Sequence, residues 1–337
     1  MLRAALRSGS DHALAELRPA HIYTADASFV MGCPKVLHRA LLNTVLGVTA
    51  AALSVGAQEQ VRATFRSSLD LVSIAVVVRD GSGRLVTGLK AQDFEVVDAG
   101  IPRPVTHFET GHDADARLAL LVDSSGSMVV GAKPDRTRMA ADFLIAKMRP
   151  ADAATVFSFD SEVRRLTPYT GNSEILRSAV SSVVPFGSTG LFDAIVGTAR
   201  TVQEDAPRAR AVVLLTDCID TASLNSAEDA ATAAARLDLP VYVLGVGSLA
   251  GQPAVSTREG SRAPFSVSDL ARRTGGLSAE ASSPAQLSVV TQTILDELHH
   301  QYVIAFEGGS EPGWHSLQVR VRKGRVNARS RDGYFVH

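Results

Sequence analysis

Cysteine is scarce in this chain of 337 residues, which contains only Cys33 and Cys218. Two cysteines are too few for a disulfide framework or for a zinc site with several thiolate ligands. An excess of charge is also lacking, since 34 Lys and Arg stand against 35 Asp and Glu. This balance argues against a nucleic-acid-binding protein, because a basic surface usually shows in the total charge. Glycine and proline follow no G-X-Y period, which excludes a collagen-like structure.

The apolar content is that of a folded protein. Hydrophobic residues make up 45% of the chain and charged residues 20%, a composition typical of globular rather than disordered proteins. At one domain per ~150 residues, the length predicts two domains.

A short apolar run near the N-terminus is typical of a secretory signal peptide. Lys35 and Arg39 precede the apolar residues 40–53, and small residues lead up to a cleavage site after Ala57. The run is shorter than the ~20 residues that a membrane-spanning helix needs. We therefore expect a secreted protein, periplasmic or extracellular, with no membrane span in the mature chain. A buried or membrane-anchoring helix is the alternative interpretation.

The first 30 residues do not fit such a signal, because they are polar and without periodicity. Met31 is the more natural start, and it would place Lys35 and Arg39 in a short basic segment before the apolar run. Cys33 precedes that run, which is the wrong place for a lipidated cysteine. We interpret residues 1–57 as an N-terminal extension and signal peptide.

From residue 117 onward, short apolar runs alternate with helical stretches. Continuous apolar runs predict strands that are covered on both faces, and intervening helices predict a mostly parallel sheet. The alternating residues 162–166 predict an antiparallel edge strand. The predicted strands are 118–122, 155–159, 212–215 and 241–246, and the predicted helices are 138–148, 173–184, 191–202, 227–237 and 284–298.

Both flanks of this region predict β-structure. The expected strands are 69–78, 84–86 and 94–97 before it, and 302–306, 316–321 and 326–329 after it. Neither flank holds enough strands for a sandwich of its own, but together they do. We therefore predict an α/β fold, a doubly wound and mostly parallel sheet at 116–298, inserted between the halves of a small β-sandwich-like domain at 58–115 and 299–337.

Three loops of the α/β region carry polar side chains at the expected carboxyl edge of the sheet, where ligands of such sheets bind. They supply carboxylates and hydroxyls but no imidazole or thiolate ligand, an all-oxygen set that suits Mg²⁺. If the carboxylates act through water, a bound cation keeps positive charge for a partner's carboxylate. Taken alone, the first of these loops also fits an ordinary turn with a helix cap. The candidate residues are Asp123, Ser125, Ser127, Thr189 and Asp217.

These residues give residues 117–298 a resemblance to the von Willebrand factor type A (VWA) domain. Asp123-Ser124-Ser125-Gly126-Ser127 is similar to the metal-ion-dependent adhesion motif of that family, Thr189 to its second-loop threonine, and Asp217 to its distal aspartate. The resemblance implies a Rossmann-like fold and a site for Mg²⁺, or alternatively Mn²⁺ or Ca²⁺. It implies the hydroxyls of Ser125, Ser127 and Thr189 as direct or near-direct ligands, with Asp123 and Asp217 acting through water.

The flanks add a narrower resemblance, and one residue departs from the family pattern. Asp93-Phe94-Glu95-Val96 and Gly333-Tyr334-Phe335 are similar to a VWFA-related bacterial family with a type A domain between β segments. Cys218 stands where the family commonly has glycine after the distal aspartate. A side chain there crowds the metal face or alters the loop, since glycine permits backbone conformations that cysteine does not. We interpret Cys218 as a small buried residue, with a reactive thiol as the alternative.

Four further polar or aromatic features have plain structural interpretations. We expect Asp193 to bond within its loop or cap a helix, and Asp220 to be a loop or helix-start residue. His299 and His300 are adjacent at the end of a helix, so they do not face each other as a metal pair would. Trp314 lies in a polar turn and is expected to pack within the β domain.

Three functions compete at this point. The first is a secreted, non-enzymatic adhesion module that binds a divalent cation and, through it, an Asp or Glu of a protein partner. The second is a metal-dependent hydrolase, which needs a base or nucleophile near the metal. No histidine follows a core strand and no G-x-S-x-G or P-loop motif is present, although Asp123 as a nucleophile stays open. The third is a structural envelope protein with a vestigial metal site.

Overall fold

The computed structural model describes residues 71–336 apart from 112–114, 206–210 and 248–265. The predictions for the signal peptide, the start at Met31, the cleavage after Ala57 and Cys33 all lie outside these residues. Among the helices that are described, none is both long and apolar enough to cross a membrane.

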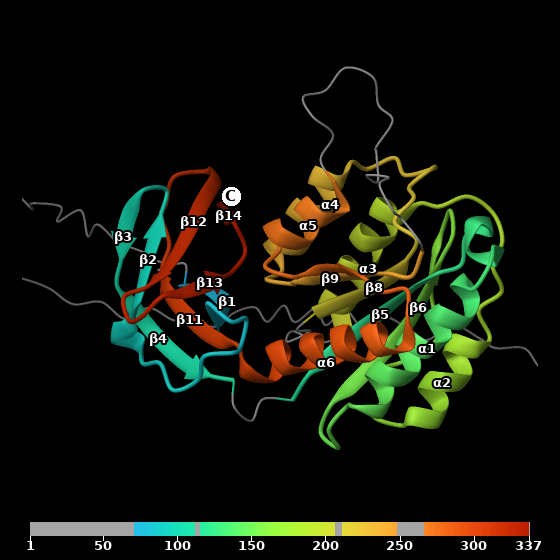
Figure 1. Ribbon diagram of the computed structural model, residues 1–337. Coiled ribbons are helices and arrows are strands. Elements are labelled where there is room, and N and C mark those ends of the chain that lie inside the picture. Colours follow the sequence, from blue (N-terminus) through green and yellow to red (C-terminus); the bar gives the residue numbers. More distant parts are fainter. Residues whose placement is uncertain (1–70, 112–114, 206–210, 248–265, 337) are drawn as a thin grey trace, which may run out of the picture. The chain divides into compact units, whose positions relative to one another are not determined.

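A six-stranded sheet forms the middle of the α/β region (Figure 1). Five of its strands are parallel, and the edge strand β7 is antiparallel to β6, as the alternating residues 162–166 predict. The strands in spatial order are β10 (Ser278–Glu280), β9 (Val241–Gly245), β8 (Ala211–Thr216), β5 (Arg117–Asp123), β6 (Ala153–Phe159) and β7 (Val163–Arg165).

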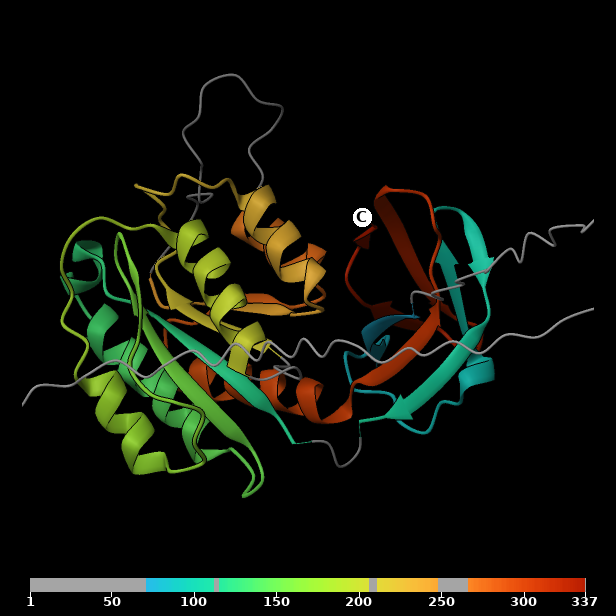
Figure 2. The ribbon, with the colours of Figure 1, turned by 180° about the vertical axis from the view of Figure 1, so that it is seen from behind.

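Helices cover both faces of this sheet (Figure 1, Figure 2). Neighbouring residues of β5 point to opposite faces. Leu118 and Leu120 pack with α1, α2 and α6, while Ala119 and Leu121 pack with α3, α4 and α5. This confirms the doubly wound α/β prediction. The helices are α1 (Lys133–Ala146), α2 (Ser173–Ser181), α3 (Leu191–Asp205), α4 (Ala227–Arg236), α5 (Val267–Arg273) and α6 (Pro284–His300).

Three elements of the region differ from the sequence-based prediction, of which the strand β10 was not expected at all. Helix α1 begins at Lys133 rather than 138, because Pro134 occupies the first turn, where its missing N–H costs no hydrogen bond. The short helix α5 was not expected. It starts at a capping box in which the Ser266 hydroxyl accepts from the Asp269 N–H and the Asp269 carboxylate accepts from the Ser266 N–H.

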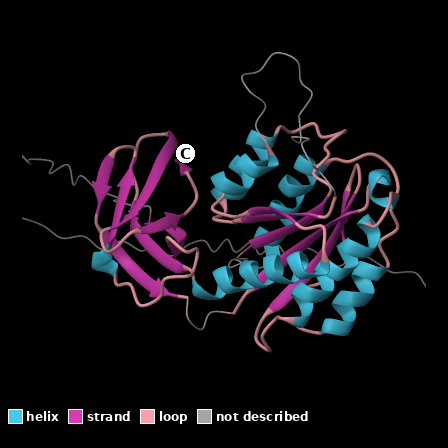
Figure 3. Ribbon diagram, viewed as in Figure 1, coloured by secondary structure: helices cyan, strands magenta, loops and turns pink. Residues whose placement is uncertain are grey.

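The strands of both flanks combine into two four-stranded sheets, drawn in magenta apart from the helices in Figure 3. β1 pairs antiparallel with β11 and with β13, so the two halves share a sheet, and an apolar core lies between the sheets. The sheets are β13 (Val326–Arg329), β1 (Leu71–Asp80), β11 (Tyr302–Glu307) and β4 (Val105–Thr110), and β14 (Gly333–Val336), β12 (Gly313–Val321), β2 (Phe94–Asp98) and β3 (Ile101–Arg103).

The prediction of a strand at 84–86 is wrong. Asp80, at the end of β1, accepts hydrogen bonds from Ser82 and Arg84 and closes a turn. After this turn only Leu85 forms a single bridge to Arg79. The remaining predicted flank strands are confirmed, with the small shifts that their observed bounds show.

A buried carboxylate connects the α/β region with the sandwich. Glu297 of α6 has a fully buried side chain and pairs with Arg79 of β1 at 2.8 Å and with Arg329 of β13. Burial raises the pKa of Tyr242 in β9, and the neighbouring Glu297 carboxylate raises it further. Glu297 therefore lies between two arginines, one from each flank of the sequence.

Replacing Glu297→Gln should lower the free energy of unfolding by about 3–5 kcal/mol, because it leaves two partly buried arginines without their countercharge. Urea unfolding of the full chain measures this. The matched control is Asp296→Asn on the next residue of α6, whose carboxylate accepts from Gln292 at the surface and which should change stability by no more than about 0.5 kcal/mol. Equal effects of the two substitutions would contradict the prediction.

Candidate functional site

The candidate site is built on two neighbouring parallel strands that end at the same edge. β5 pairs with β8, with Val122 opposite Leu215, so Asp123 and Asp217 follow at adjacent strand ends. The Thr216 hydroxyl donates to Asp123 Oδ2 at 2.5 Å. The strand pairing therefore brings the two carboxylates of the motif together.

The first loop folds back on its own carboxylate. The Ser125 N–H donates to Asp123 Oδ1 at 2.9 Å, and the Ser125 and Ser127 hydroxyl oxygens lie 3.1 Å apart. Asp123 and Ser125 are buried. Burial raises the pKa of Asp123 to about 6, although hydrogen bonds from Ser125 and Thr216 lower it, and the charge of Asp217 raises it slightly. The loop thus presents two hydroxyls beside a carboxyl that water does not solvate.

The second loop is bonded to the other two through its backbone. The Phe186 N–H donates to the Ser124 carbonyl at 2.7 Å, and the Thr189 carbonyl accepts from the N–H groups of Thr221 and Ala222. Thr189 is 2% exposed. Its hydroxyl makes no hydrogen bond with a residue that the structure describes. That hydroxyl is therefore free for a ligand.

A lysine that the sequence analysis did not consider reaches the third loop. Lys133 Nζ lies 2.7 Å from Asp217 Oδ2 and 3.1 Å from the Ser127 carbonyl oxygen. The Asp217 side chain is fully buried, and that of Lys133 is 20% exposed. The ammonium therefore supplies the positive charge that a buried carboxylate requires. Since the predicted helix began at 138, the sequence placed Lys133 in a loop and gave no signal of this contact.

Cys218 adopts the left-handed backbone conformation that its position in the loop demands. Its φ is +63°, a value that glycine reaches without strain and other residues rarely adopt. The residue is buried among apolar neighbours, as expected. Burial raises the pKa of its thiol to about 12, and the charges of Asp217, Glu280 and Asp123 act in the same direction. The backbone of the loop is therefore strained at Cys218, and the thiol is not an activated nucleophile.

The donor chemistry of the site fits a hard divalent cation. Three hydroxyls and two carboxylates come from loops that are bonded to each other, and an ammonium already lies against one of the carboxylates. Within the described ranges, no three His, Cys, Asp or Glu side chains come close enough to hold a metal ion. A metal held here would therefore need the Ser and Thr hydroxyls among its ligands.

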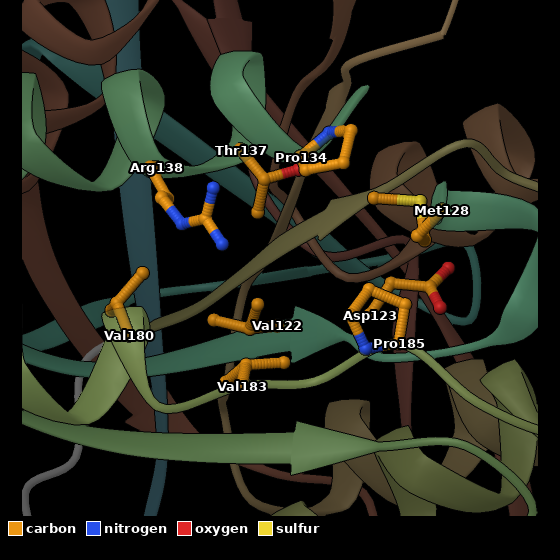
Figure 4. Close-up of a pocket in the computed structure, with 9 residues that line it drawn as sticks. All are labelled: Val122, Asp123, Met128, Pro134, Thr137, Arg138, Val180, Val183 and Pro185. Carbon is orange, nitrogen blue, oxygen red and sulfur yellow. The ribbon is translucent and has the colours of Figure 1, made fainter. Parts of the chain in front are cut away.

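A small, half-open pocket lies beside Asp123 (Figure 4). Apolar side chains line most of it, Met128 and Pro185 flank Asp123, and Arg138 lies across from them. The pocket contains none of the other candidate ligands, so we do not assign it a ligand.

The four features with plain interpretations behave largely as expected. Asp193 differs, because it neither bonds within its own loop nor caps its own helix: from the first turn of α3 it accepts from the N–H groups of Leu224 and Asn225. The carboxylate of Asp220 accepts from the Leu191 N–H and so caps α3. At the end of α6, His299 faces Asp152 rather than His300.

The expected turn at Trp314 is wrong. The residue lies in β12, where it pairs with Phe335 of β14, and it is 40% exposed. Its ring contacts the guanidinium of Arg273 on α5.

Comparison with known proteins places this architecture in a family. Residues 118–219 match the family model of the von Willebrand factor type A domain. No curated protein matches the chain. An α/β protein with an oxygen-rich site at its carboxyl edge is the class that fold and site define. More narrowly, the chain carries a match to the VWA domain over residues 118–219, as the sequence motifs predict.

Solved structures with a similar fold include three bacterial proteins. An aerotolerance-related membrane protein from Bacteroides fragilis shares 19% identity over 54% of this chain and 98% of its own, with a TM-score of 0.45. BatB from Bacteroides thetaiotaomicron shares 20% over 54% and 98%, with a TM-score of 0.44. A von Willebrand factor type A protein from Catenulispora acidiphila shares 12% over 79% and 75%, with a TM-score of 0.46.

The strain at Cys218 predicts an unusual order of stability. Cys218→Gly should be more stable than Cys218→Ala by about 1 kcal/mol, because both lose the thiol but only alanine keeps a Cβ in the left-handed region. Urea unfolding in metal-free buffer measures the difference. Ala222 in the same loop lies outside that region, so Ala222→Gly should instead destabilise by about 0.5–1 kcal/mol. A Cys218→Ala variant more stable than Cys218→Gly would contradict the argument.

Proposed function

We propose that this protein is a secreted, non-enzymatic binding module that holds a divalent cation and, through it, a carboxylate of a protein partner. The cation is Mg²⁺, or alternatively Mn²⁺ or Ca²⁺. The observation that carries the proposal is the joining of three loops into one oxygen-rich edge around buried carboxylates. The residues that would hold the cation are Asp123, Ser125, Ser127, Thr189 and Asp217.

Each part of the edge has a definite task in this proposal. The hydroxyls of Ser125, Ser127 and Thr189 are neutral oxygen ligands, and so they do not neutralise the charge of the cation. Asp123 is held in place by hydrogen bonds from the Ser125 N–H and the Thr216 hydroxyl, which orient its carboxylate. A bound cation supplies an open coordination position for an incoming Asp or Glu.

The described histidines support a binding module over a hydrolase. They lie away from the candidate site, each against a partner of its own: His107 against Glu109, His299 against Asp152, His300 against the Asp296 carbonyl, and His315 against Asp98. Asp123, the remaining candidate nucleophile, already accepts two hydrogen bonds within its own edge. A hydrolytic site needs a base that these contacts do not provide.

Titration of the full chain with Mg²⁺ or Mn²⁺ in a calorimeter tests the site. The parent should bind, and the double variant Ser125→Ala/Thr189→Ala should bind at least about tenfold more weakly, since it lacks two of the oxygen ligands. The control is Ser182→Ala/Thr293→Ala, whose hydroxyls donate to backbone carbonyls on α2 and α6; it should bind like the parent. Parent-like binding by the site variant, or no binding by the parent, would refute the proposed site.

Lys133 is expected to compete with the cation for Asp217. Lys133→Met should raise the affinity for Mg²⁺ by about tenfold, because no ammonium then has to leave the carboxylate. Without metal the variant should melt at a lower temperature than the parent, and added Mg²⁺ should raise its melting temperature more. Lys147→Met is the control, since that ammonium binds Ser288 of α6 instead. Unchanged or weaker affinity in Lys133→Met would show that the lysine does not compete.

A further inference from the structure

Large apolar side chains are exposed on the three loops that carry the candidate site. Val129 and Val130 follow the first loop's serines, Val184 and Phe186 precede Thr189, and Leu224 follows Asp217. Their exposed fractions are 58%, 66%, 78%, 80% and 80%, respectively. These five residues, which we name the apolar rim, include the most exposed large apolar side chains among the residues that the structure describes.

Backbone hydrogen bonds hold the apolar rim to the candidate ligands. The Val130 N–H donates to the Ser127 carbonyl, and the Phe186 N–H donates to the Ser124 carbonyl. The chain leading to Leu224 is bonded through Thr221 and Ala222 to the Thr189 carbonyl. All three loops therefore carry the rim and the site together, at the carboxyl edge of the sheet.

The side chains of the apolar rim are mostly exposed in the part of the chain that the structure describes. In the same 3₁₀ turn (Gly126–Val129), Met128 is 1% exposed and fills the core, whereas Val129 is turned out to solvent. Exposed apolar residues that cluster around one feature indicate an interaction surface, while single ones need no explanation. Their presence on three loops that are bonded to one another points to a partner that contacts all three loops.

Basic side chains at the start of α1 lie at the same edge, each with a partner within the protein. Lys133 reaches Asp217, and Arg136 donates to the carbonyl of Val246, which directly follows β9. Arg138 lines the pocket beside Asp123 and also contacts the exposed Asp135 at 3.5 Å (Figure 4). Lys133 and Arg138 already pair with Asp217 and Asp135, so the attraction for a partner that brings negative charge comes from the bound cation of the proposed site.

We propose that the partner presents an Asp or Glu flanked by large apolar side chains, with the carboxylate at the cation and the flanking side chains on the apolar rim. This proposal rests on the proposed cation site and names the chemistry of what that site binds. The cation, held by neutral hydroxyl ligands, binds the partner's carboxylate. The apolar rim distinguishes a partner with apolar flanking residues from one with polar flanking residues.

Three synthetic peptides test the inference by calorimetry on the full chain with saturating Mg²⁺. The first carries a central Asp flanked by Leu and Phe, the second carries the same Asp flanked by Ser, and the third replaces Asp by Asn in the apolar context. The first should bind at least about tenfold more tightly than either of the others. The double variant Phe186→Ser/Leu224→Ser should lose that preference, since both positions are exposed and their change spares the core.

The control variant is Ile175→Ser/Val289→Ser, which removes two exposed apolar side chains on α2 and α6; it should keep the preference. Equal binding of the Leu/Phe-flanked and Ser-flanked peptides, or no binding of any peptide to the Mg²⁺-loaded chain, would overturn the inference while leaving the cation site standing. A parent that fails to bind Mg²⁺ would overturn the proposed function first. Sedimentation could instead show that the parent is a dimer and that Phe186→Ser/Leu224→Ser is a monomer. That result would assign the rim to contact with a second copy of this chain and would also overturn the inference.

Discussion

The parallel pairing of β5 with β8 is the constraint on which the candidate site depends. Both strands are buried on both faces, and their register places Asp123 and Asp217 at neighbouring ends. The Thr216 hydroxyl bridges from one strand to the carboxylate of the other. The loops that follow can bring hydroxyls close because this core fixes where each loop begins.

Placing two carboxylates at a buried edge creates a demand for positive charge. Burial raises the pKa of Asp123, and Asp217 lies in contact with the Lys133 ammonium. A divalent cation and a lysine can each supply this positive charge, but with different consequences. In the proposed function, a bound cation would offer an open coordination position to a partner, whereas the lysine only neutralises a carboxylate, and so competition between them would change the binding of the partner.

The sandwich depends on a second buried charge. Its two halves come from opposite ends of the described sequence, and Glu297 of the last helix pairs with one arginine from each half. An α/β region inserted between two β segments is held to both in this way. The contact explains why a carboxylate is buried in a helix whose other inward residues are mostly apolar.

The sequence by itself determined the doubly wound α/β fold, the antiparallel edge strand, the sharing of a β domain by the two flanks, and the five candidate ligands. Continuous apolar runs, alternation of apolar and polar residues, and polar residues at strand ends are local patterns that the sequence shows directly. The resemblance to the VWA domain identified the five candidate ligands as one set. Short elements such as α5 were not predicted, because seven residues carry too little periodicity. The prediction of a strand at 84–86 was wrong because a turn closed by Asp80 ends β1 just before it.

Only the tertiary structure decided what surrounds the candidate ligands. The ion pair between Lys133 and Asp217 joins residues 84 positions apart, and no spacing rule predicts it. The sequence marked Cys218 as a departure, but the positive φ that makes it strained is visible only in the folded loop. The apolar rim gathers from three separate loops for the same reason: exposure depends on how distant segments pack, and a local pattern carries no information about that.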